Sequence, residues 1–120
     1  MEGKVDWKFA RDAVGGDGDL LFELVEIFFE EYPKLMAGIQ SSIESKTYLE
    51  LRRFSHTLKG SLRYFGKTEA GVLSGRLEDM GRECQIEGAM QLVGELQSEM
   101  NALLPELSAF VASQSPKTNP

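Results

Sequence analysis

Apolar residues recur along most of this 120-residue chain at alternating steps of three and four. That period is typical of a helix that lays one face on a core. It runs over residues 6–14, 19–45, 47–65 and 87–113, and over a further segment that follows Thr68. No segment alternates apolar and polar residues as a half-buried strand does. We therefore predict an all-α fold, an antiparallel up-down four-helix bundle with a short additional N-terminal helix.

Glycine, aspartate and proline set the expected boundaries. Gly15 and Gly16 can end the first helix, and Asp17 or Asp19 can cap the second. Pro33 interrupts the second helix, but the apolar period continues beyond it in the same phase, so we expect one bent helix. The sequence predicts a single domain over residues 1–113 and a disordered polar tail over 114–120.

Two expectations concern the core. Trp7, Phe9 and Val14 are expected to cover one end of it. Cys84 continues the apolar face of the fourth helix, so we expect a small buried side chain there. As the chain's only cysteine, it also excludes an internal disulfide framework.

Composition narrows the function classes. The net charge is −6, which argues against general nucleic-acid binding, because that function needs a broad basic surface. The chain has no uncharged stretch long enough to span a membrane and no signal-peptide pattern. We expect a soluble, cytoplasmic protein without direct membrane contact. One histidine, without an H-E-x-x-H motif, does not assemble a closed metal site, so no bound metal is expected.

The candidate chemistry lies on the third helix. His56 is the only histidine. At 100° per residue, Leu51, Phe54, Leu58, Leu62 and Phe65 share one face with Ser55 at its edge, and His56 points the other way. The imidazole is therefore expected at the surface, either as an incidental residue or as a reactive one.

Its neighbours favour the reactive interpretation. Arg52, Lys59 and Arg63 border His56 on the outward face, and residues 51–68 include five basic and no acidic residues. Such a patch attracts an anion and disfavours the imidazolium, leaving more neutral imidazole. Gly60 lies one turn beyond His56, where glycine costs about 1 kcal/mol relative to alanine. We interpret it as clearance for something bulky approaching the ring.

The run His56-Thr57-Leu58-Lys59-Gly60-Ser61, followed by Phe65-Gly66 and by Leu73, Leu77 and Glu78, resembles the histidine-containing phosphotransfer (HPt) domain of bacterial multistep phosphorelays. The resemblance extends over roughly residues 6–112. Leu62 stands where a small residue is common in that family, and Tyr64-Phe65 is bulkier than usual.

This resemblance implies a phosphorelay intermediate. A receiver-domain aspartate would pass a phosphoryl group to His56, and a second receiver would remove it. Lys59 and Arg63 would stabilise the phosphoryl group, Gly60 would give access, and Leu49, Arg52 and Arg53 are candidates for receiver docking. The chain would be a monomeric phosphocarrier and not an enzyme. It would need no cofactor of its own, because Mg²⁺ would be bound by the receiver. Its partners would be response-regulator receivers or a hybrid histidine kinase.

Two other functions compete with this one. Composition and fold alone would favour a helical interaction module with an incidental His56, and only His56, Lys59 and Gly60 together argue against it. The dimerisation domain of a histidine kinase also places a histidine on a helical bundle. In that family an acidic residue and then a proline typically follow the histidine, whereas Thr57 follows here.

Overall fold

The chain is helical almost throughout. The computed structural model describes residues 3–114, and in this range it contains no strand. The all-α prediction is therefore confirmed. The elements in chain order are α1 (Trp7–Ala13), α2 (Gly18–Ser45), α3 (Tyr48–Leu62), the 3₁₀ turn η1 (Arg63–Phe65), α4 (Glu69–Arg82) and α5 (Ala89–Gln114).

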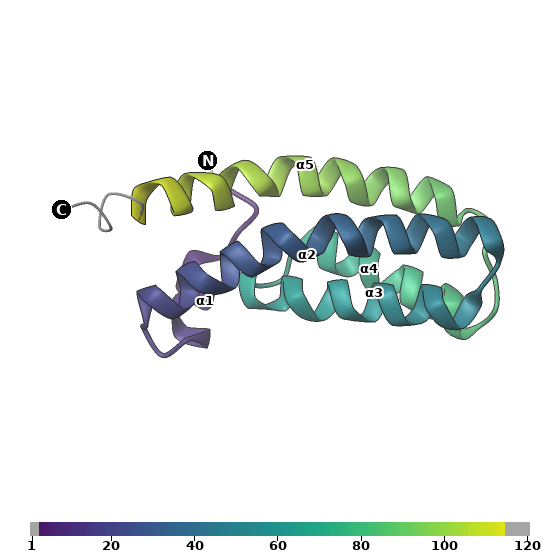
Figure 1. The fold of residues 1–120 in the computed structure, drawn as a ribbon, viewed down its shortest axis with the longest axis horizontal. Coiled ribbons are helices and arrows are strands. Elements are labelled where there is room, and N and C mark those ends of the chain that lie inside the picture. Colours follow the sequence, from purple (N-terminus) through teal and green to yellow (C-terminus); the bar gives the residue numbers. More distant parts are fainter. Residues whose placement is uncertain (1–2, 115–120) are drawn as a thin grey trace.

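The four longer helices lie side by side in an elongated bundle of 51 × 29 × 23 Å (Figure 1). α3 packs against α2 and α4, and α5 packs against the same two helices. The short α1 contacts η1 and α2 at one end of the bundle. α3 therefore lies between α2 and α4 and keeps one face free of other helices.

Capping side chains fix where the helices begin. Asp17 Oδ1 accepts hydrogen bonds from the amides of Asp19 and Leu20, both at 3.1 Å, so Asp17 is the cap of α2. Thr68 Oγ1 accepts from the Gly71 amide at 3.0 Å and caps α4. Both caps agree with the sequence pattern.

Proline and glycine affect the backbone at two places. α2 runs through Pro33 as one helix, as its unbroken apolar phase predicts. After α3 the chain tightens into η1 and leaves it at Gly66, whose φ of 95° is unfavourable for residues with a side chain. The predicted helix over 47–65 is therefore an α-helix with a 3₁₀ end.

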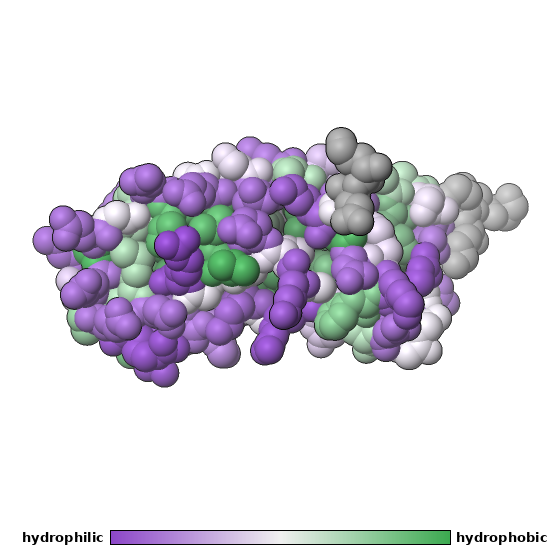
Figure 2. All heavy atoms as spheres, turned by 180° about the vertical axis from the view of Figure 1, so that it is seen from behind, coloured by the Kyte–Doolittle hydropathy of each residue, from purple (hydrophilic) through white to green (hydrophobic). Residues whose placement is uncertain are grey.

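The core is built from the predicted apolar faces. Leu51, Leu58, Leu62 and Phe65 of the third helix and its 3₁₀ end are buried, while Phe54 is only partly buried. The equivalent residues of the other long helices are also buried: Leu21, Val25, Phe28, Leu35, Met36, Ile39 and Ile43 on α2, Ala70, Leu73 and Leu77 on α4, and Val93, Leu96, Met100, Leu103 and Leu107 on α5. Seen from behind, the surface is mostly hydrophilic around a limited apolar area (Figure 2).

Two expectations about individual residues were wrong. Cys84 is exposed, because α4 ends at Arg82 and the chain turns at a φ of 57° at the cysteine. Trp7 stacks on Phe110 at one end of the core and Val14 packs there too, but Phe9 is 48% exposed. The tail predicted over 114–120 lies almost wholly outside the described range, which ends at Gln114, the last residue of α5.

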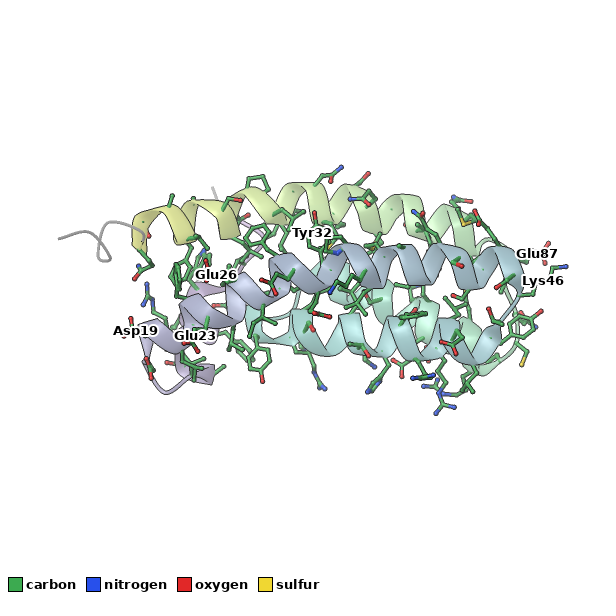
Figure 3. All side chains as sticks on the ribbon, in the orientation of Figure 1. Asp19, Glu23, Glu26, Tyr32, Lys46 and Glu87 are labelled. Atoms are coloured by element: carbon green, nitrogen blue, oxygen red, sulfur yellow. The ribbon has the colours of Figure 1, made fainter. Side chains whose placement is uncertain are left out.

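Two further observations concern the surface. The acidic residues Glu23 and Glu26 project from the exposed side of α2, as a solvated face would (Figure 3). Among the described residues, no helix is both long and apolar enough to cross a membrane.

Candidate functional site

His56 lies near the middle of α3 on the face that no other helix covers. Its side chain is 67% exposed, which agrees with the outward position that the helical period predicts. One turn further on, a Cβ added to Gly60 would meet no atom within 4 Å beyond its own helix and chain neighbours. The approach to the ring over Gly60 is therefore open.

A carboxylate from the neighbouring helix contacts the histidine. Glu78 of α4 is only 5% exposed, and its Oε2 lies 2.9 Å from His56 Nδ1. Lys59 Nζ forms an ion pair with Glu78 Oε1 at 2.6 Å, and an Arg82 guanidinium nitrogen lies 3.3 Å from Oε2. Glu78 thus joins the histidine to two cations.

The charge of Glu78 determines the tautomer of His56. Burial raises the pKa of the Glu78 carboxyl, but the hydrogen bonds and positive charges of Lys59 and His56 outweigh burial and hold the pKa below its usual value. Glu78 is therefore ionised at neutral pH and can only accept hydrogen bonds. His56 Nδ1 must then donate the proton, so the neutral ring carries its lone pair on the other nitrogen, Nε2.

Close packing of α3 on α4 makes this contact possible. A Cβ at Gly81 would lie 2.6 Å from the Arg52 amide nitrogen and 2.8 Å from the Tyr48 carbonyl oxygen. The two backbones therefore touch where only glycine fits. Glu78 lies three residues before Gly81, one helical turn away. The glycine thus brings this part of α4 close enough for Glu78 to reach His56.

Gly75 has a related position. A Cβ there would lie 3.4 Å from Lys59 Cδ, an ordinary contact, so the lysine stem passes over α4 beside this glycine. Lys59 is only partly exposed, at 34% of its side chain. Its ammonium group was expected to point to water, but Glu78 binds it in this structure.

The structure brings only some of the other predicted residues together. Leu49, Arg52 and Arg53 line an open hollow with His56 and Glu78. Leu49 is 64% exposed, unusually high for a leucine, and Arg53 lies 3.4 Å from Glu50 on its own helix.

Arg63 lies in η1, past the end of α3, and does not line that hollow. It is exposed and, within residues 3–114, pairs with no acid. The surroundings of His56 also differ from the expected wholly basic patch, since α4 adds Glu78 to the basic residues of α3.

Glu78 and Arg82 are the residues to which the sequence interpretation assigned no role. A weak signal exists in the row Gly71, Gly75, Glu78 and Arg82, which is spaced four, three and four along one face of α4. Helical periodicity places these residues in line. It does not say which residue of another helix they meet.

These features define a class of protein: a helical bundle that displays one oriented histidine beside a lysine. Comparison with known families agrees. The model of the Hpt domain matches residues 23–106, well over half of the chain, and the chain belongs to that family.

The chain is also similar to an individual curated protein. The chain is 26% identical over 107 residues to the phosphorelay intermediate protein rdeA of Dictyostelium discoideum. The match covers 89% of this chain but 42% of that protein, so the chain spans less than half the length of this relative. No solved structure matches.

Proposed function

We propose that this chain is a phosphorelay intermediate that accepts a phosphoryl group on His56 from a receiver-domain aspartate and passes it to another receiver. One observation supports this above the others: Nδ1 of the exposed ring lies 2.9 Å from the buried Glu78 carboxylate, which can only accept, so that Nε2 keeps the lone pair of the neutral ring. Membership of the Hpt family and the name of the Dictyostelium relative point the same way.

The first transfer uses the Nε2 lone pair. Nε2 attacks phosphorus in line, the bond from phosphorus to the aspartyl oxygen breaks, and the carboxylate leaves with the electron pair. Glu78 orients the ring by accepting from Nδ1, and so acts as a positioning residue. Mg²⁺ and the catalytic groups belong to the receiver, so this chain is a phosphocarrier that needs no cofactor of its own.

Basic residues stabilise the phosphorylated state. Lys59 lies one turn from His56 and would leave Glu78 to form a charge-assisted hydrogen bond with the phosphoryl group. Arg63 lies further along the same face and adds a weaker, screened attraction.

The receiver docks over the uncovered face of α3. Leu49 offers an apolar contact beside Arg52 and Arg53, and the open space at Gly60 admits the receiver's catalytic edge. Response-regulator receivers or a hybrid histidine kinase are the partners, and we propose that the chain acts as a cytoplasmic monomer.

The finer description of the fold belongs to the same proposal. Short turns join α2 to α3, α3 to α4 and α4 to α5, and each of these helices has two of the others as neighbours. An antiparallel up-down four-helix bundle accounts for both facts.

The test is to incubate the chain with phosphorylated receivers and assay for acid-labile, base-stable phosphate on the chain. We expect label on the unsubstituted chain and none on His56→Gln, with the helical circular dichroism unchanged. Label on neither chain from any receiver would favour an interaction module in which His56 is incidental.

A further inference from the structure

Glu78 is a carboxylate, although a neutral acceptor would be enough to orient the ring. An amide oxygen could also accept the hydrogen bond from Nδ1. Keeping an ionised carboxylate only 5% exposed is costly unless its charge is compensated. Here Lys59 and Arg82 both lie within ion-pair distance of it. An amide would orient the ring without needing these two cations, so the negative charge points to a role beyond the tautomer.

The chemistry of the phosphorylated ring supplies one. When a neutral imidazole that carries Nδ1–H is phosphorylated on Nε2, both nitrogens become substituted and the ring becomes an imidazolium. This cation can lose its Nδ1 proton. If it does, the leaving group of the next transfer is an imidazolate, which is much poorer than neutral imidazole. A group that holds the Nδ1 proton therefore keeps the phosphoryl group transferable.

We propose that Glu78 holds the phosphorylated His56 ring as an imidazolium, and so acts as a positioning residue for the second, outgoing transfer. This inference rests on the proposed function. Oε2 lies 2.9 Å from Nδ1, where a negative charge stabilises the cationic ring directly. The same hydrogen bond orients the neutral ring before phosphorylation.

With this proton in place, the cycle balances without any proton transfer. In the outgoing step a receiver carboxylate oxygen attacks phosphorus, the P–Nε2 bond breaks and its electron pair returns to Nε2. The ring leaves as neutral imidazole that still carries Nδ1–H, which is the state in which the cycle began. Glu78 accepts the same hydrogen bond throughout.

The surrounding charges fit this role. The charged residues that line the hollow with His56 are Arg52 and Arg53 of α3, which oppose a cationic ring, and Glu78 of α4, which favours it. Only Glu78 contacts Nδ1 among the described residues. If Lys59 turns to the phosphoryl group, Arg82 still lies 3.3 Å from Oε2 and keeps the carboxylate ionised.

The single histidine makes the test direct, because the imidazole nitrogen signals of the chain can come only from His56. The chain is labelled with ¹⁵N and phosphorylated with phosphoramidate, whose P–N bond breaks to release ammonia. The Nδ1 signal is then followed against pH in the folded chain and in the same chain unfolded in urea. We expect the folded ring to keep its Nδ1 proton to a pH higher by about one unit or more, the usual effect of a contacting opposite charge.

Glu78→Gln separates charge from orientation, because the amide oxygen can still accept from Nδ1. We expect it to take up phosphate, to lose most of the upward pH shift, and to pass phosphate to a receiver several-fold more slowly as the pH rises. Glu83→Gln makes the same chemical change at the exposed C-cap of α4 and should leave both properties unchanged.

The outcomes distinguish this inference from the proposed function. A folded, phosphorylated ring that loses its Nδ1 proton at the same pH as in urea, or at a lower pH, would overturn the inference and leave the phosphorelay function standing. This comparison needs no substitution, so it holds even if Glu78→Gln does not fold. Failure of phosphoramidate to label His56 would overturn both.

Discussion

Gly60 and Gly81 both lie within helices, where a residue with a side chain would favour the helix more, but for opposite physical reasons. Gly60 on α3 faces open space, whereas Gly81 on α4 touches the backbone of Arg52 and Tyr48. The first glycine belongs to the outward surface that a partner must approach. The second lies in the contact between α3 and α4, and this close packing brings Glu78 within hydrogen-bond distance of His56. The reactive face of α3 therefore depends on the close backbone contact between α3 and α4 at Gly81.

The largest effect is expected from the cation that bridges these two regions. Lys59 contacts Glu78, whereas within residues 3–114 the acid that pairs with Arg53 is Glu50 on its own helix. A close charge-assisted hydrogen bond to the phosphoryl group contributes about 1.5–3 kcal/mol, roughly ten- to a hundredfold in rate or lifetime. Lys59→Ala should therefore shorten the phosphohistidine lifetime or slow transfer far more than Arg53→Ala. Equal effects of the two substitutions in a transfer assay would mean that Lys59 acts only through the general positive charge of this face and forms no specific bond to the phosphoryl group.

The next largest effect concerns the contact between the helices. Gly81→Ala places a Cβ within 2.6 Å of the Arg52 amide nitrogen, so the helices must separate. We expect a loss of about 1–3 kcal/mol in the free energy of unfolding, measured by urea denaturation. The His56 ring should also lose its fixed tautomer, which ¹⁵N NMR reports. Gly94→Ala is the control, because a Cβ at this exposed glycine of α5 meets nothing within 4 Å. Unchanged stability and tautomer in Gly81→Ala would refute the positioning role of this contact.

A larger side chain at Gly60 tests whether the open space there is needed for a receiver to reach His56. Gly60→Gln should obstruct a receiver and slow transfer from it by about tenfold, equivalent to about 1.4 kcal/mol. Phosphoramidate needs less room, so its reaction with His56 should change little. Normal transfer from the receiver in this variant would contradict the clearance argument.

The smallest effect has the opposite sign. Gly60→Ala adds helix propensity and meets no neighbour, so it should raise the free energy of unfolding by about 0.5–1 kcal/mol. Thermal denaturation of Gly60→Ala and Gly81→Ala, measured in parallel, shows the sign of each change. A destabilised Gly60→Ala would mean that this face is packed after all.

Periodicity accounts for the part of this molecule that could be predicted. The apolar stripe of α3 places His56 and Gly60 outward, and both are exposed. The unbroken apolar phase of α2 likewise predicts one helix through Pro33, which the structure shows. Each of these properties belongs to a single helix and its own repeat.

What could not be predicted depends on where two helices meet or on where one ends. The contact between His56 and Glu78 joins residues 22 positions apart, and it exists because Gly81 allows α4 to approach α3 closely. The apolar repeat of one helix does not indicate which residue of another helix its side chains will meet. Cys84 was misplaced for another reason: the apolar phase of α4 was extended past Arg82, where the helix has already ended.

A two-receiver time course with labelled phosphate tests most directly whether His56 carries the phosphoryl group from one receiver to another. One phosphorylated receiver, the chain and a second receiver are mixed, and the label on each is followed. We expect label on the chain before it appears on the second receiver. With His56→Gln the label should stay on the first receiver, while thermal stability stays nearly unchanged. Label that reaches the second receiver equally well with His56→Gln would show that His56 is not the residue that carries the phosphoryl group.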